Sequence, residues 1–202
     1  MYRGSQPADS RGVSTEAVLT MSLEGQFLVA SRELLDPNFA RSVVLMVQHS
    51  EEGAMGLVIN RPTKTTLAEA WKQVSEAPCP TNGLIYLGGP CRGPLMALHA
   101  DSGEGEIEIV SGLHFSADPD KIESLIGKGE EPSRFFIGFA GWGPGQLEAE
   151  MGQDSWLLTP ATPEHVFDAP HDVWHKIIRQ ISTSQMIEAL NIKHVPVDPS
   201  LN

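Results

Sequence analysis

Apolar residues are grouped along the chain in short runs, and most of these runs predict β-strands. The run at 42–49 is almost wholly apolar and includes two adjacent valines near its start, which is typical of a strand buried on both faces. A loop that contains Gly53 separates it from the apolar run at 54–60, so the two runs predict a hairpin. Other strands are predicted at 27–31, 84–90, 94–100, 106–110, 134–140 and 155–160.

Helices are predicted where a capping residue precedes an apolar stripe. Thr66 and Glu69 have the spacing of a capping box. Asp118 and Thr162 are each followed by proline, which is favoured at the first helical position. An apolar stripe with helical spacing runs from 173 to 181, and short helices are expected at 146–151 and around 185–190.

The predicted elements define the fold class and the domain organisation. Because hairpins outnumber β-α-β units, we expect an α+β fold with a mixed, largely antiparallel sheet and several short helices. Residues 1–20 are polar and show no periodicity, so they are interpreted as a mobile N-terminal arm. Residues 21–202 contain no long linker and no internal repeat, and they are expected to form a single domain.

The charge of the chain limits its choice of partners. Lys and Arg number 14 and Asp and Glu number 26, which gives a formal net charge of −12. Direct nucleic-acid binding is therefore not expected, because duplex binding is driven by basic groups that displace counterions. Nine carboxylates but only two lysines lie within 101–131. This segment lacks the EF-hand order of acids and is interpreted as a solvated acidic face.

The cysteines and the apolar runs bear on cellular location. Cys79 and Cys91 are too few for a disulfide framework. No apolar run approaches the roughly 20 residues of a membrane span, and residues 1–17 lack the apolar centre of a secretory signal. We therefore expect a cytoplasmic protein without membrane contact, in which both thiols are reduced and unpaired.

Three separated motifs resemble those of the YqgE/AlgH family of bacterial proteins. They are LLDPNFARSVVLMVQHSEEGAMGLVINRPT at 34–63, GGP at 88–90, and GWGPGQLEAEM at 141–151 followed by Trp156. The resemblance runs from about Phe27 to Ile181. It implies an α+β fold whose bifurcated sheet curls into a partial barrel. Members of this largely uncharacterised family are often described as transcriptional regulators, after one member linked to alginate production.

Two positions depart from the pattern of the family. Ser31-Arg32 occupies a place where members usually have Met-Pro, and Gln48 occupies a place where they usually have Glu before the histidine. If a Glu–His pair of neighbouring residues acts in the family, this chain cannot use it in that way.

Two strand ends contain the first candidate site residues. His49 ends one strand of the predicted hairpin, and Asn60-Arg61-Pro62 ends the other. The Arg61 guanidinium can offer a bidentate fork to an anionic or peptide ligand. The alternative is structural: Asn60 and Arg61 hydrogen-bond loop carbonyls, and Pro62 stops the strand.

The turn Gly88-Gly89-Pro90 is the second candidate. Its two glycines permit a positive φ angle, and its proline fixes the exit of the chain. Cys91 follows directly and stands beside Arg92, so it is a candidate reactive thiol. The alternative is that this cysteine is an inert small side chain.

The turn 141–146 is the third candidate, with Trp142, Gly145 and Gln146 as its site residues. It can present main-chain amides to an anion, although it matches neither a Walker loop nor G-x-G-x-x-G. The alternative is a close junction between a strand and a helix. Trp142 would then be a packing anchor, and Gln146 would share a helix face with Glu150.

No cofactor and no metal site is predicted. His171 and His175 are four residues apart, as in H-E-x-x-H, with Asp172 in place of the glutamate. A third ligand is not evident, and the shorter aspartate would place its carboxylate differently. A Gly-x-Ser-x-Gly elbow of a serine hydrolase does not occur either.

Two hypotheses for function follow. The leading one is a non-enzymatic cytoplasmic domain that binds a small ligand or a protein partner, with the regulatory role that the family resemblance implies. Its binding cleft would form where the three motif turns meet. The alternative is an enzyme or redox sensor that uses Cys91 or His49 in that cleft. The candidate ligand-binding residues are His49, Asn60, Arg61, Gly88, Gly89, Trp142, Gly145 and Gln146.

Overall fold

A branched β-sheet dominates the computed structural model of the chain, which describes residues 22–81, 83–129, 132–168 and 172–189. The main path of the sheet is β10-β1-β2-β3-β9-β6-β8-β7, and β5, with β4 beside it, also pairs with β9. The predicted arm at 1–20 lies outside the described residues. The strands are β1 (Gln26–Ala30), β2 (Val43–Ser50), β3 (Gly53–Val58), β4 (Pro62–Thr66), β5 (Leu84–Leu87), β6 (Cys91–His99), β7 (Ile107–Val110), β8 (Leu113–Ser116), β9 (Ser133–Trp142) and β10 (Trp156–Pro160).

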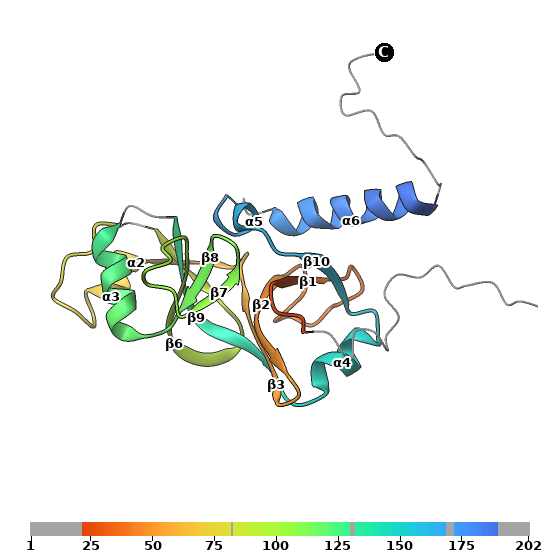
Figure 1. Cartoon of the computed structure of the whole chain (residues 1–202), viewed down its shortest axis with the longest axis horizontal. Helices are drawn as coiled ribbons and strands as arrows, with labels where there is room; N and C mark the ends of the chain where they lie inside the picture. Colours follow the sequence, from red (N-terminus) through yellow and green to blue (C-terminus); the bar gives the residue numbers. More distant parts are fainter. Residues whose placement is uncertain (1–21, 82, 130–131, 169–171, 190–202) are drawn as a thin grey trace, which may run out of the picture.

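The described helices cover the two sides of this sheet. They are α2 (Leu67–Trp71), α3 (Pro119–Lys128), α4 (Gln146–Met151), α5 (Pro163–Phe167) and α6 (Val173–Ala189). Helices α2 and α3 lie at one end of the molecule, α5 and α6 lie along β1 and β10, and α4 lies near the tip of the β2–β3 hairpin (Figure 1).

Strand β9 is the branch point of the sheet. Its first part, up to Phe139, pairs with β6 and, in parallel, with β5, whereas Ala140–Trp142 pairs with β3. Gly138, whose φ is +71°, lies close to the change of partner. The other strand pairings are antiparallel. The α+β class is therefore confirmed, and the sheet curls into a half-barrel, as the resemblance implied (Figure 1).

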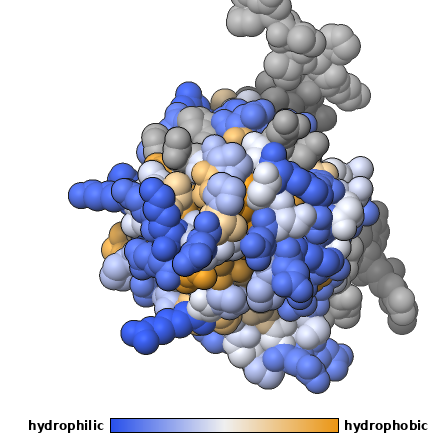
Figure 2. Space-filling model, turned by 90° about the vertical axis from the view of Figure 1, so that its left-hand side faces the viewer, coloured by the Kyte–Doolittle hydropathy of each residue, from blue (hydrophilic) through white to orange (hydrophobic). Residues whose placement is uncertain are grey.

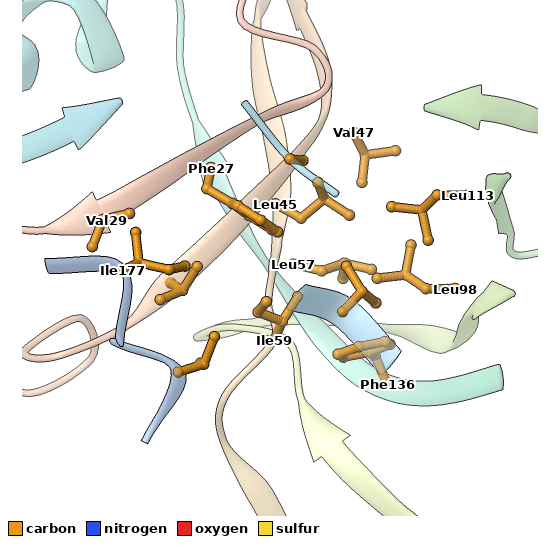
Figure 3. Packing of buried hydrophobic residues seen from close by; sticks show 14 of the residues in the cluster. Phe27, Val29, Leu45, Val47, Leu57, Ile59, Leu98, Leu113, Phe136 and Ile177 are labelled. Carbon is orange, nitrogen blue, oxygen red and sulfur yellow. The ribbon is translucent and has the colours of Figure 1, made fainter. Parts of the chain in front are cut away.

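Strands β1, β2 and β3 are covered on both faces. On one face, Phe27 and Leu45 pack in a large cluster that also contains Ile177 of α6 (Figure 3). On the other face, Leu28 and Val44 belong to a second cluster, which is closed by α4 and β10. A third cluster packs α2 and α3 against β5, β6 and β9. The two-sided burial explains why the apolar run of β2 is continuous rather than alternating.

Two strands and one helix differ from the sequence-based prediction. Strand β4 is the polar segment PTKTT, so no apolar run marks it. Strand β8 includes His114 and Ser116 at buried positions. Because these residues are polar, the sequence shows no apolar run there that predicts a strand. Helix α6 continues through 182–184, where the pattern predicts a break, because those polar side chains are exposed and leave the buried stripe undisturbed.

The acidic segment lies at the end of the molecule that α2 and α3 cover. Lys128 Nζ lies 2.6 Å from Asp101 Oδ2 and 2.8 Å from Glu104 Oε1, and its hydrogen bonds lower the pKa of both carboxyl groups. This face is mostly hydrophilic, with apolar side chains visible between the polar ones (Figure 2). Among the described residues, no group of His, Cys, Asp and Glu is arranged to hold a metal ion.

In the part of the chain that the structure describes, no helix combines the length and the apolar character that crossing a membrane requires.

His99 lies fully buried next to this acidic segment. The Ser116 hydroxyl donates to Glu104 O at 2.6 Å, so it accepts a hydrogen bond from His99 Nε2 at 3.1 Å. Burial, and then the neighbouring His114 ring, lowers the pKa of His99 below its usual value of 6.5. The folded protein therefore favours the neutral imidazole.

This lowered pKa predicts a loss of stability on mild acidification. As the pH falls below about 6.5, the unfolded chain binds a proton at His99 that the folded protein resists, so the melting temperature should fall. Asp101 and Glu104, whose pKa is also lowered, lose their stabilising effect only at lower pH. Thermal melts between about pH 7 and about pH 5.5 cover the titration range of histidine and stay above that of these carboxyl groups. His99→Gln keeps a donor and should flatten the dependence; an unchanged slope would contradict the assignment.

Candidate functional site

Most of the candidate residues lie at the two ends of β3. Ala54, near the start of β3, pairs with both His49 and Trp142, whereas Asn60 follows the end of the strand. Six extended residues span about 20 Å. His49, Trp142, Gly145 and Gln146 lie at the start of β3, and Asn60 and Arg61 follow its end. The Gly88-Gly89 turn lies between them, with the Gly88 carbonyl hydrogen-bonded to Val58 N and Gly89 against Phe139 and Ala140. The turns at Asn60-Arg61-Pro62 and 141–146 are therefore separated by the length of β3, and the Gly88-Gly89-Pro90 turn lies alongside the strand between them.

Asn60 and Arg61 hold the loop between β1 and β2. Asn60 Oδ1 accepts from Val43 N at 3.0 Å, and its Nδ2 donates to Arg41 O at 2.9 Å. Arg61 Nη2 donates to Ala40 O at 3.1 Å, and its Nη1 donates to a second carbonyl of the loop at 3.5 Å. Both side chains satisfy backbone groups, so the guanidinium fork of Arg61 is already occupied by the protein.

Gly88 and Gly89 allow the chain to pass close to β9. A Cβ atom on Gly88 would lie 2.2 Å from Gly138 O, and one on Gly89 would lie 2.2 Å from Phe139 C. The Gly88 carbonyl also accepts from Val58 N at 2.8 Å. The turn is thus a place where backbones approach too closely for any side chain.

In the turn 141–146, the side chains hydrogen-bond to one carboxylate, that of Glu150. Gln146 Oε1 accepts from Gly143 N at 3.1 Å, and its Nε2 donates to Glu150 Oε1 at 3.0 Å. Glu150 Oε2 accepts from the indole N–H of Trp142 at 2.9 Å and from that of Trp156 at 3.1 Å. The predicted pairing of Gln146 with Glu150 on one helix face is confirmed. Gly145, with φ at +71°, is the capping residue of α4.

His49 is held by three hydrogen bonds. Its Nδ1 accepts from Leu23 N at 3.2 Å, its Nε2 lies 3.0 Å from Glu148 Oε1, and its backbone N donates to Glu24 Oε1 at 3.0 Å. Because a backbone N–H can only donate, Nδ1 is unprotonated and Nε2 bears the proton that points to Glu148. Both ring nitrogens are engaged within the protein, and neither offers a free lone pair.

A groove of about 500 Å³ lies beside His49 at the tip of the β2–β3 hairpin. Its lining includes Glu24, Glu52 and Gln48, together with Met55 and Trp142. Among the residues that the structure describes, neither Lys nor Arg lines it. The groove therefore has a negatively charged, partly apolar surface.

Neither cysteine is among the described residues that line this groove. Cys91 begins β6 and pairs with Phe139 of β9, whereas Cys79 Sγ donates to Thr81 O at 3.3 Å. Both thiols are unpaired, as predicted. His49 lines the groove and Cys91 does not. His171, which was considered as a zinc ligand together with His175, lies outside the described residues.

Glu24 and Glu148 are site residues that the sequence analysis missed. They contact His49 from positions 25 and 99 residues away, and no local pattern reports such pairings. A signal for Glu148 did exist, because it lies within the motif GWGPGQLEAEM. The chain lacks the usual glutamate next to the histidine, at Gln48, and α4 supplies a carboxylate to His49 from elsewhere.

A curled α+β domain with these motifs at its turns defines a known class of bacterial proteins. The chain belongs to the AlgH-like family, whose model (DUF179) matches residues 27–185. The resemblance to the YqgE/AlgH family is thereby confirmed over most of the chain.

Individual relatives agree with this assignment. The chain is 37% identical over 162 residues to a UPF0301 protein of Chlorobaculum tepidum, covering 77% of this chain and 84% of the relative. It is 42% identical over 159 residues to a UPF0301 protein of Myxococcus xanthus, covering 75% and 87%. Among solved structures, it is similar to the solution structure of the AlgH protein from Pseudomonas aeruginosa. The TM-score is 0.66 and the identity 31%, with 97% of this chain and 100% of that chain covered.

Proposed function

We propose that this chain is a non-enzymatic binding domain with a regulatory role in the cytoplasm, and that the groove beside His49 takes a basic segment of a protein partner. The observation that supports this best is the charge of the groove, whose lining, among the described residues, includes Glu24 and Glu52 but neither Lys nor Arg. Lys and Arg side chains donate charge-assisted hydrogen bonds to such carboxylates. The net charge of −12 also favours a basic partner over nucleic acid.

The state of His49 favours binding over catalysis. A general base needs a free lone pair within reach of the proton that it removes, and both nitrogens of His49 already have partners. A nucleophilic thiol needs an adjacent base, and Cys91 lies outside the groove. These observations rank the enzyme or redox-sensor hypothesis below the binding domain.

Fluorescence polarisation with two labelled octapeptides tests the proposal, one alternating Lys and Ser and the other alternating Glu and Ser. The Lys peptide should bind and the Glu peptide should not. The double variant Glu24→Gln/Glu52→Gln, whose amide oxygen at position 24 can still accept from the backbone N of His49, should weaken binding about fivefold or more. Glu108→Gln removes an exposed charge on β7 and is the control. An equal loss in the control, or no loss in the double variant, would reject the groove as the site.

A further inference from the structure

A second cavity, of about 480 Å³, lies between the loop after β1 and helix α6. Trp174 and Ile178 of α6 give it an apolar wall. The indole Nε1 of Trp174 donates to Ala30 O at 2.7 Å and so fixes α6 to the end of β1. Leu35, which is 83% exposed, extends the apolar surface into solvent.

Three arginines line the same cavity. Arg32 and Arg41 come from the loop and Arg179 from α6, and neither Asp nor Glu is among the described residues of the lining. Within the described parts of the chain, none of the three forms an ion pair with a carboxylate. All three side chains are exposed, and their positive charges together favour an anion at this cavity. This cationic cluster occurs in a chain in which acidic residues outnumber basic ones.

Arg41 is held in an unusual backbone conformation. Its φ is +58°, in the left-handed region that non-glycine residues rarely adopt. Asn60 Nδ2 donates to its carbonyl, and Arg61 donates to the carbonyl of Ala40 before it. The Arg41 guanidinium carbon then lies 6.0 Å from the centroid of the Trp174 ring. The motif residues Asn60 and Arg61 thus position an arginine at the cavity wall.

Ser31 adds a buried hydroxyl to the lining. The residue is 5% exposed, and its Oγ has no hydrogen-bond partner among the residues that the structure describes. Buried polar atoms are nearly always hydrogen-bonded. The Ser31 hydroxyl therefore has an unused donor at the wall of the arginine-lined cavity.

We infer that this cavity binds a small phosphate monoester whose ester group is apolar. A phosphate dianion accepts hydrogen bonds from several guanidinium groups at once, in the geometry that arginine prefers, and the Ser31 hydroxyl supplies a further donor. The apolar group would cover Trp174 and Ile178. The volume falls within the roughly 300–1,000 Å³ of small-molecule sites. The cavity adjoins the start of β2, whereas the His49 groove adjoins its end, so this inference is independent of the proposed function.

Isothermal titration of the full chain with hexyl phosphate tests the inference. We expect saturable one-to-one binding that weakens as salt is added. Inorganic phosphate and hexanoate, which lack the tail and the second charge respectively, should each bind about tenfold more weakly. Hexyltrimethylammonium, with the opposite charge, should not bind. Arg179→Ala and Ser31→Ala should each weaken the binding of hexyl phosphate, the arginine variant by about tenfold.

Two further variants make the result decisive. Arg41→Asn retains a residue that tolerates positive φ, so it should fold normally and still lose affinity. Arg92→Ala removes an exposed arginine of β6, outside the cavity, and should bind as the wild type does. No saturable binding of hexyl phosphate, equal binding of hexyltrimethylammonium, or wild-type affinity in a folded Arg179→Ala variant would each overturn the inference.

Discussion

Gly89→Ala should destabilise the fold more than a comparable change at any other candidate residue. A Cβ atom there would lie 2.2 Å from Phe139 C and 2.3 Å from Ala140 N, which are backbone atoms of the branch strand β9. These atoms cannot move without breaking the pairing of β9 with β3, and the φ of +155° at Gly89 adds strain. We expect a loss of about 4 kcal/mol or more in the free energy of unfolding, or failure to fold.

Two matched substitutions separate crowding from backbone strain. Gly145 has a φ of +71° but nothing within 4 Å of an added Cβ, so Gly145→Ala should cost about 1 kcal/mol from strain alone. Gly127, inside α3, is equally open and has no positive φ. Gly127→Ala should stabilise the protein by about 0.5–1 kcal/mol. Urea unfolding followed by circular dichroism measures all three. Similar losses at Gly89 and Gly145 would contradict a role for close backbone approach.

The sequence predicted local structure well because local hydrogen bonds determine it. Thr66 and Glu69 form the reciprocal bonds of a capping box, and Asp118 and Thr162 cap α3 and α5. Helix α4 has the predicted bounds, 146–151. Each of these signals depends on side chains within a few residues of the backbone groups that they satisfy.

The candidate site was less predictable because its contacts join distant parts of the chain. His49 and Glu148 are 99 residues apart, and Trp174 and its acceptor Ala30 are 144 residues apart. Neither the hydrophobic periodicity nor the spacing of residues in a motif predicts contacts over such sequence distances. The structural interpretation of Asn60 and Arg61, which competed with ligand binding, matches their contacts with the loop at 36–41.

The departure of this chain from its family also acquires a physical meaning. Ser31-Arg32, which replaces the usual Met-Pro, lies in the lining of the arginine cavity. A serine hydroxyl and a guanidinium group there make the cavity more polar and more cationic than the usual residues would. The preference of the inferred phosphate site for a charged head group therefore depends in part on Ser31 and Arg32.

Glu150→Ala should cost about 3 kcal/mol in the free energy of unfolding. One carboxylate oxygen accepts from the indole N–H groups of Trp142 and Trp156, and these side chains are only 5% and 4% exposed. Removing the acceptor leaves two desolvated donors without a partner, each at a cost of about 1–3 kcal/mol. The third partner, Gln146, would at the same time lose its anchor for the Gly143 turn.

Two other variants identify the origin of this loss. Glu150→Gln keeps one acceptor oxygen but removes the charge, so it should cost about half as much. Glu148→Ala changes the same residue type on the same helix, but it leaves one imidazole donor of His49 without its partner rather than two indoles, so it should cost about half as much as Glu150→Ala or less. Guanidinium chloride unfolding followed by far-ultraviolet circular dichroism avoids the direct effect of these changes on tryptophan emission. If Glu148→Ala and Glu150→Ala were equally damaging, the loss would belong to α4 as a helix, and the indole pair would not be what holds the GWGPG turn in place.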